Sequence, residues 1–103
     1  MEISAIAGTL LINAAGTLER SSVERLRDHI RASDRPVVLD LSGVETVEPE
    51  ALDMLRNQWR ALGDRLRVVA PHSSAAADAL KRAGLRRFAV HASLSGALAQ
   101  AAE

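Results

Sequence analysis

The residues with the clearest chemical potential are acidic, and they are concentrated in one part of the sequence. Between Pro36 and Leu55 the chain carries five carboxylates and no lysine or arginine. These are Asp40, Glu45, Glu48, Glu50 and Asp53. Carboxylates that share one surface attract a cationic partner, but acids in the first turn of a helix also complement the helix dipole. The pattern predicts an acidic rim, and both interpretations of it stay open.

The sequence lacks the residue patterns of an enzyme. It has no cysteine, which excludes disulfides, thiolate zinc sites and a cysteine nucleophile. The glycines are isolated and form no phosphate-binding loop. The histidines have no metal-binding spacing; they are His29, His72 and His91. The best placed serines fit helix caps rather than nucleophiles; they are Ser21, Ser73 and Ser93. We therefore predict a non-enzyme without catalytic residues, cofactors or bound metal.

Two further features are interpreted as structural. A basic cluster follows the acidic segment in the sequence and comprises Lys81, Arg82, Arg86 and Arg87. Cations at a helix C-terminus are locally stabilising, so we favour a solvated face over a site for lipid or for an acidic protein. Trp59 lies at helical spacing with Leu52, Leu55 and Leu62, which predicts core packing.

Length and charge restrict the class of protein. The chain has 103 residues, and 13 basic residues balance 13 acidic ones. This length predicts one domain spanning residues 1–103. Zero net charge argues against nucleic acid as a partner, and no basic leader or long apolar run precedes or interrupts the domain. We expect a cytoplasmic protein without direct membrane insertion.

The first half of the sequence predicts a hairpin, a helix, a strand and a second helix. Apolar runs at 3–7 and 10–14 flank Gly8-Thr9, which indicates a tight turn. Ser21 and Glu24 have the spacing of a capping box, predicting a helix over 22–32. Residues 37–41 form a continuous apolar run typical of a central parallel strand. Pro49 suits the first turn of a second helix that ends at Gly63.

The second half continues the alternation. A strand is predicted at 66–70, and a third helix, capped by Ser73 or Ser74, runs through Ala83 and closes at Gly84 with Leu85 in contact. A short strand at 88–90 precedes a fourth helix that begins at Ser93. This order predicts an α/β fold, with a mostly parallel mixed sheet of about five strands flanked by about four helices.

The sequence VVLDLSGVETV at 37–47 resembles the STAS domain family, named for sulfate transporters and anti-sigma factor antagonists. Residues 65–71, 80–88 and 93–98 resemble that family's last strand pair, third helix and terminal helix in order. The resemblance covers nearly the whole chain and implies a STAS-like single domain.

The resemblance also implies a function and a site. In bacterial anti-anti-sigma factors the loop before the second helix resembles Asp-Ser-Ser-Gly-Leu, and a partner kinase phosphorylates the second serine. The matching residues here are Glu48, Pro49, Glu50, Ala51 and Leu52. Glu50 occupies the phosphoacceptor position, so the phosphoacceptor is absent and serine regulation there is not expected. Glu50 is then either a permanent mimic of the phosphorylated state or a residue that only stabilises the helix terminus.

These observations lead to two functional hypotheses. The first is a regulatory binding module, similar to anti-sigma factor antagonists in transcription regulation, that docks on an anti-sigma factor of the serine kinase type. Its predicted contact residues are Glu48, Pro49, Glu50, Ala51, Leu52 and Asp53. The alternative is a small STAS accessory subunit of a membrane ABC transporter of the lipid-transport type, bound to its ATPase subunit.

Overall fold

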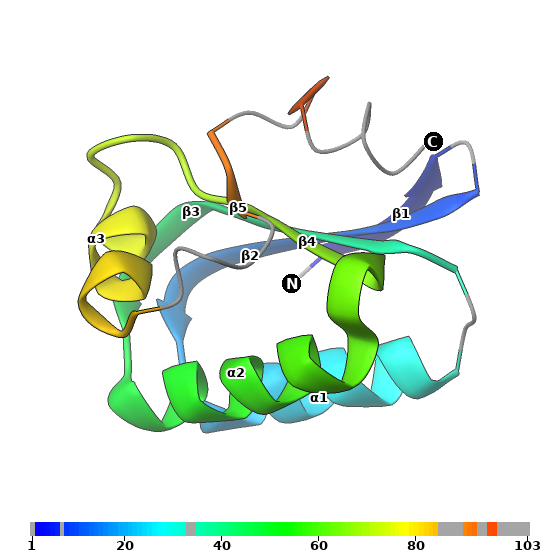
Figure 1. The fold of residues 1–103 in the computed structure, drawn as a ribbon, viewed down its shortest axis with the longest axis horizontal. Coiled ribbons are helices and arrows are strands. Elements are labelled where there is room, and N and C mark those ends of the chain that lie inside the picture. The colour runs from blue at the N-terminus through cyan, green and yellow to red at the C-terminus, as the bar shows by residue number, and fades with distance from the viewer. Residues whose placement is uncertain (1, 7, 33–34, 85–89, 93–94, 97–103) are drawn as a thin grey trace.

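The sheet has five strands in the order β1-β2-β3-β4-β5 (Figure 1). A computed structural model describes residues 2–6, 8–32, 35–84, 90–92 and 95–96. The strands are β1 (Glu2–Ile6), β2 (Thr9–Leu18), β3 (Val37–Val47), β4 (Leu66–Val69) and β5 (Val90–His91). β1 is antiparallel to β2, and every other neighbouring pair is parallel. The predicted mixed, mostly parallel sheet is confirmed.

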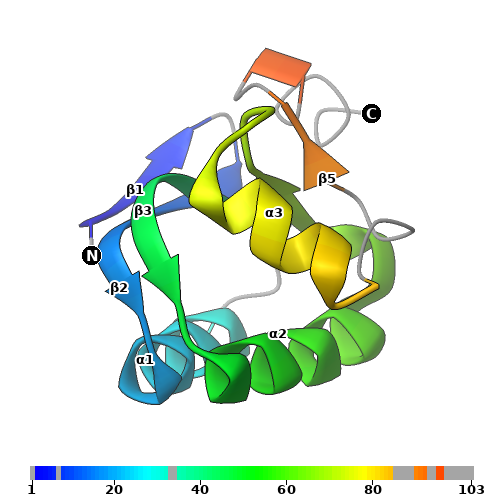
Figure 2. The same ribbon diagram turned by 90° about the vertical axis from the view of Figure 1, so that its left-hand side faces the viewer.

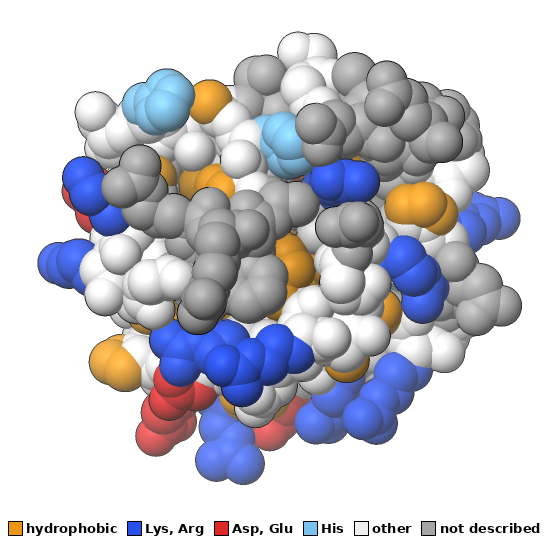
Figure 3. Space-filling view, viewed as in Figure 1, with side chains coloured by type: hydrophobic (Ala, Val, Ile, Leu, Met, Phe, Trp, Pro, Cys, Tyr) orange, Lys and Arg blue, Asp and Glu red, His pale blue; other side chains and the backbone are white. Residues whose placement is uncertain are grey.

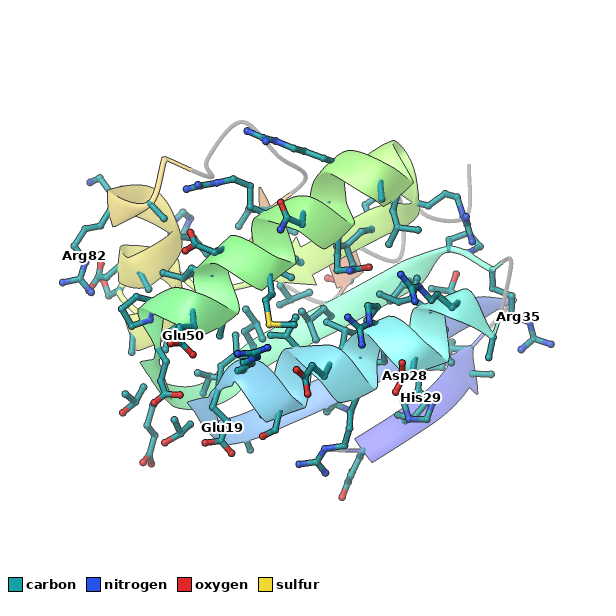
Figure 4. All side chains as sticks on the ribbon, turned by 90° about the horizontal axis from the view of Figure 1, so that it is seen from below. Glu19, Asp28, His29, Arg35, Glu50 and Arg82 are labelled. Atoms are coloured by element: carbon teal, nitrogen blue, oxygen red, sulfur yellow. The ribbon has the colours of Figure 1, made fainter. Side chains whose placement is uncertain are left out.

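Helices separate the parallel strands, as the crossover rule requires. The helices are α1 (Arg20–Arg31), α2 (Pro49–Leu62), the short 3₁₀ helix η1 (Gly63–Arg65) and α3 (Ala75–Arg82). α1 and α2 lie side by side on one face of the sheet (Figures 1 and 4). α3 lies at one end of the sheet, close to β3 (Figure 2). Apolar side chains of all three α-helices join one core with β2, β3 and β4.

Trp59 is the largest side chain in that core and is only 1% exposed. Its indole Nε1 donates a hydrogen bond of 3.0 Å to the carbonyl oxygen of Leu66, at the start of β4. This bond satisfies the one polar group of the indole and ties α2 to the sheet. The prediction that Trp59 packs in the core is confirmed.

The opposite face of the sheet carries a second, smaller buried cluster, made of Leu11, Val38 and Val69. Successive side chains of a strand point to opposite faces, so these residues alternate with those that face the helices. The edge strand β1 differs from both clusters because all five of its residues are exposed.

Several predicted helix ends are confirmed. α2 begins with Pro49 in its first turn and ends at Gly63, whose φ of 58° suits glycine. Ser74 is the N-cap of α3, and its hydroxyl accepts a 3.1 Å hydrogen bond from the amide of Ala77. The predicted strand at 88–90 shares Val90 with β5, while residues 88 and 89 lie outside the described residues. Leu85 and most of the predicted fourth helix lie outside them too.

The predicted start of the first helix is wrong. α1 begins at Arg20 with Glu19 as its N-cap, and the amide of Val23 donates to the Glu19 carbonyl oxygen at 3.2 Å. Ser21 therefore lies inside the first turn, where its hydroxyl donates to the Glu19 carboxylate at 3.1 Å. The helix starts early because β2 stays paired with β3 up to Leu18, which leaves Glu19 as the turning point.

β2 and β3 are both longer than predicted, since they continue through polar and small residues to Leu18 and Val47. The pairing shifts register between Asn13 and Ala15 and again between Gly16 and Thr17. Gly16 has a φ of 75°, a conformation that a bulge often places on glycine. The irregular register hides the usual alternation of apolar and polar residues in this part of the sequence.

Candidate functional site

The segment matched to the phosphorylation loop is held between the sheet and α2. The amide of Glu48 donates a 3.0 Å hydrogen bond to the carbonyl oxygen of Leu18, at the end of β2. The Glu48 carbonyl oxygen accepts from the amides of Ala51 and Leu52 at 3.0 and 3.2 Å. Pro49 adds a fixed φ at the first helical position. The backbone here is therefore fixed in place before any partner arrives.

Five of the six predicted contact residues reach the surface. Glu48, Pro49, Glu50 and Asp53 are exposed, and Leu52 is half-buried. Ala51 is 0% exposed and belongs to the core. Its methyl group anchors the first turn of α2 rather than facing outward. We call the exposed group the α2-start surface, which comprises Glu48, Pro49, Glu50, Leu52 and Asp53.

The carboxylates of this surface differ in their surroundings. Asp53 lies 3.7 Å from the Arg56 guanidinium, one turn along the helix, with its own side chain 75% exposed. Arg56 in turn donates a 2.9 Å hydrogen bond to the carbonyl oxygen of Ala83, at the end of α3. Within the described part of the chain, Glu48 and Glu50 form no ion pair. These two carboxylates are therefore free to meet a cation from outside.

Glu19 is a further acidic residue of this region, and local sequence patterns do not predict it. Leu18 pairs with Val47, so Glu19 and Glu48 follow neighbouring parallel strands at the same edge of the sheet. Both residues are exposed N-caps, Glu19 of α1 and Glu48 of α2. Figure 4 shows Glu19 and Glu50 at the same end of the helix pair. The sequence signal that could have identified Glu19 is a glutamate directly after each of two parallel strands and directly before a helix.

Asp40 does not belong to the predicted acidic rim. β3 continues for seven residues beyond Asp40, which therefore lies inside the strand, on the face that also carries Val38. Its Oδ1 accepts a 2.9 Å hydrogen bond from the amide of Ser42. Glu45, by contrast, is exposed near the end of β3. The rim therefore extends from Glu45 to the α2-start surface and includes Glu19.

Cationic side chains gather at the other end of the helix pair. Arg31 and Arg60 are in the last turns of α1 and α2, while Arg35 and Arg65 precede β3 and β4. All four are exposed. Figure 4 shows Arg35 at the end opposite to Glu19 and Glu50, and Figure 3 shows many blue side chains along the helix side of the molecule. Arginines therefore outnumber the acids described at this end, although exposed Asp28 also lies here, and Arg20 and Arg82 lie at the same end as Glu50.

The remaining candidates are dispersed. His29 is exposed on α1, His72 is exposed in the β4–α3 loop, and His91 ends β5. Across the described ranges no three histidine or carboxylate side chains form a group that could hold a metal ion. Lys81 and Arg82 are exposed at the end of α3, whereas Arg86 and Arg87 lie outside the described residues. In the part of the chain that is described, no helix is long and apolar enough to span a membrane.

Comparison with known proteins finds relatives through structure only. No family model matches the sequence, and no curated protein matches it. An anti-sigma factor antagonist from Mycobacterium paratuberculosis is similar with a TM-score of 0.83 and 24% identity, over 99% of this chain and 92% of that one. A sulfate transporter family protein from Wolinella succinogenes is similar with a TM-score of 0.75 and 18% identity, over 95% and 88% of the two chains.

The anti-sigma factor antagonist SpoIIAA in its unphosphorylated form is a third similar structure. It has a TM-score of 0.69 at 10% identity, with 95% of this chain and 93% of that chain covered. At these identities the similarity concerns the fold. It spans nearly the full length of each of the three proteins.

Proposed function

We propose, from the premise that this chain has the STAS fold, that it is a non-catalytic regulatory binding module of the anti-sigma factor antagonist type. In this proposal the α2-start surface docks on an anti-sigma factor of the serine kinase type in the cytoplasm. The observation that carries it is the rigid, exposed start of α2, with two unpaired carboxylates at Glu48 and Glu50. The structural similarity to two anti-sigma factor antagonists supports the choice of partner.

The physical argument rests on preorganisation and charge. Hydrogen bonds to Leu18, Ala51 and Leu52 already fix the backbone at Glu48. This chain therefore loses little conformational entropy when a partner binds. Pro49 and half-buried Leu52 offer apolar contact between the carboxylates. Acidic side chains around such a contact favour a cationic partner and speed its association.

The proposal implies binding without a phosphorylation switch at this surface. Glu48, Pro49 and Glu50 have no hydroxyl group. Incubated with ATP and a kinase-type anti-sigma factor, the protein should gain no phosphoryl group at residues 48–53, as measured by intact mass and peptide mapping. A stable phosphoryl group on a nearby exposed hydroxyl, such as Ser42 or Thr46, would contradict regulation without a switch.

Two substitutions at Glu50 test the docking role directly. If Glu50 is an attractive contact that loses water on binding, Glu50→Gln and Glu50→Ser should each weaken partner binding by about 1–2 kcal/mol, which is more than an exposed ion pair contributes. Isothermal titration calorimetry with the purified anti-sigma factor measures the change. Thermal melts check the loss of about 0.3–1 kcal/mol expected from the helix dipole alone.

Asp28→Asn is the matched control, because Asp28 is an exposed acid at the other end of the helix pair (Figure 4). It should leave the affinity unchanged. Tighter binding by Glu50→Ser would show instead that Glu50 mimics a phosphorylated, released state. Unchanged affinity for both Glu50 variants would leave only the helix-terminus role.

The similarity to the sulfate transporter family protein favours one alternative, in which this chain is an accessory STAS subunit of a membrane transporter. The two functions differ in their partner. Calorimetry with a purified transporter ATPase subunit, run beside the anti-sigma factor, distinguishes them. Binding to the ATPase subunit alone would replace the main proposal by this alternative.

A further inference from the structure

A cavity of about 490 Å³ lies between the β4–α3 loop, α3 and β5, away from the α2-start surface. Its volume is within the range of ligand pockets, roughly 300–1,000 Å³. Small and branched apolar side chains form part of the wall; they are Ala70, Ala77, Leu80 and Val90. The cavity can therefore hold a small molecule with an apolar body.

The polar part of the wall includes one permanent cation. Lys81 lines the cavity from the last turn of α3, on the same helix face as Ala77 and Asp78. Among the described residues, no carboxylate lies within 4.0 Å of its ammonium group. A cation without an ion-pair partner among the described residues, at the wall of a cavity with both polar and apolar lining, favours an anionic group on the ligand.

Ser73 adds a hydroxyl at the cost of backbone strain. It has a φ of 67°, the left-handed conformation that glycine adopts easily and other residues rarely do. The amide of Ser74 donates to the carbonyl oxygen of Pro71 at 3.1 Å, which closes a tight turn with Ser73 at its third position. Ser73 lines the cavity, and a serine at a position suited to glycine is explained if its hydroxyl serves a ligand there.

Two histidines complete the polar groups. His72 and His91 line the cavity from the loop and from β5. The buried Nε2 of His91 has no hydrogen-bond partner in the described structure. Burial, together with the charge of Arg67, holds the pKa of His91 below 6.5. A neutral imidazole of this kind can donate a hydrogen bond or accept one.

Asp78 restricts the charge of the ligand. Asp78 also lines the cavity, so its negative charge would repel a second negative charge on the ligand. Among the described lining residues, the one permanent cation, the one carboxylate and the apolar side chains together favour a monoanion over a dianion. Near neutral pH a carboxylate carries one negative charge, whereas a phosphate monoester carries about 1.5 to 2.

We propose that this cavity binds a small aliphatic carboxylate, with the carboxylate group at Lys81 and Ser73 and the apolar chain against Leu80 and Val90. The site is separate from the α2-start surface, and either can be present without the other.

The test is a titration of the full chain with hexanoate, acetate and inorganic phosphate, followed by two-dimensional NMR at neutral pH and constant ionic strength. Hexanoate should give saturable shifts at Ser73, Ala77 and His91. It should bind at least about tenfold more tightly than acetate, since each buried methylene group adds affinity. Phosphate should bind more weakly than hexanoate. Equal affinity for all three probes, or shifts that do not saturate, would overturn the proposal.

Matched variants locate the site. Lys81→Gln should weaken hexanoate binding about tenfold or more, while Arg82→Gln removes the same charge from the next residue of α3, outside the cavity wall, and should change it less than twofold. Ser73→Gly suits the left-handed backbone, so it should keep the fold and still weaken binding. Equal effects of the lysine and arginine variants would show a nonspecific charge effect and contradict the assignment. Circular dichroism melts confirm that each variant is folded.

Discussion

Trp59→Ala should lower the free energy of unfolding by about 3–5 kcal/mol, the range found for large aromatic side chains removed from a core. Trp59 is 1% exposed and joins α2 to the start of β4. Since small domains have only about 5–15 kcal/mol of net stability, the variant should melt at least about 12 °C lower than the wild type. Urea unfolding followed by circular dichroism measures the change without depending on the indole signal.

Trp59→Phe separates packing from hydrogen bonding. Phenylalanine retains an aromatic ring but cannot donate to the carbonyl oxygen of Leu66, so this variant should lose about 1–3 kcal/mol. Leu52→Ala, at a half-buried position of the same helix, is a control with less apolar area to lose. A loss for Trp59→Ala no larger than that for Leu52→Ala would contradict the central role of the indole.

Reversing both unpaired carboxylates of the α2-start surface should nearly abolish binding to the proposed anti-sigma factor. Glu48→Lys combined with Glu50→Lys places cations where the proposal expects a cationic partner, and such like-charge contacts cost several kcal/mol. We expect an increase of about a hundredfold or more in Kd. Calorimetry at low and at physiological salt measures it, and the wild-type affinity should weaken as salt rises.

Two controls accompany the reversal. Asp28→Lys reverses a single carboxylate at the other end of the helix pair, half the change of charge of the double variant, and should alter Kd by less than threefold. Thermal melts should show that the double variant remains folded, because neither Glu48 nor Glu50 makes a side-chain hydrogen bond that caps α2. Binding that is equally weakened by both reversals would point to a general charge effect and against docking at this surface.

The parts of the fold that were predictable are those with strong local signals. Pro49 and Gly63 mark α2 because their preferred backbone angles match a helix start and a helix end. Ser74 caps α3 through a hydrogen bond to an amide three residues away, which depends on local sequence alone. The alternation of strands and helices was sufficient to predict a mostly parallel sheet.

The parts that were missed depend on contacts between distant segments. The second halves of β2 and β3 contain Gly16 and Gly43, which are poor strand formers. They remain in strands because β2 and β3 pair with each other along this part. The two backbones lie close together here, since a Cβ added at Gly43 would lie 3.3 Å from that of Ala15. Ser21 has a local capping signal, but the end of β2 at Leu18 makes Glu19 the cap instead.

The same distinction holds for the candidate site. The stretch from Glu48 to Asp53 was selected by its local composition, and its exposure in the structure fits that selection except at Ala51. Ala51 faces the core because it lies on the same helix face as Leu55 and Trp59. Glu19 was missed because its closeness to Glu48 arises from pairing between β2 and β3, which are far apart in sequence.

Exposed carboxylates of Glu19, Glu48 and Glu50 gather at the start of α1 and α2 in a chain whose net charge is zero. The field of a charged partner turns a protein with such a local excess of charge, but exerts little net pull on it. A cationic partner would turn the Glu19 and Glu50 end toward itself while the two proteins are still separated by water, within roughly a Debye length of about 8–10 Å. The orientation of the encounter would thus be biased before any side chains touch, and ions in solution would weaken this bias.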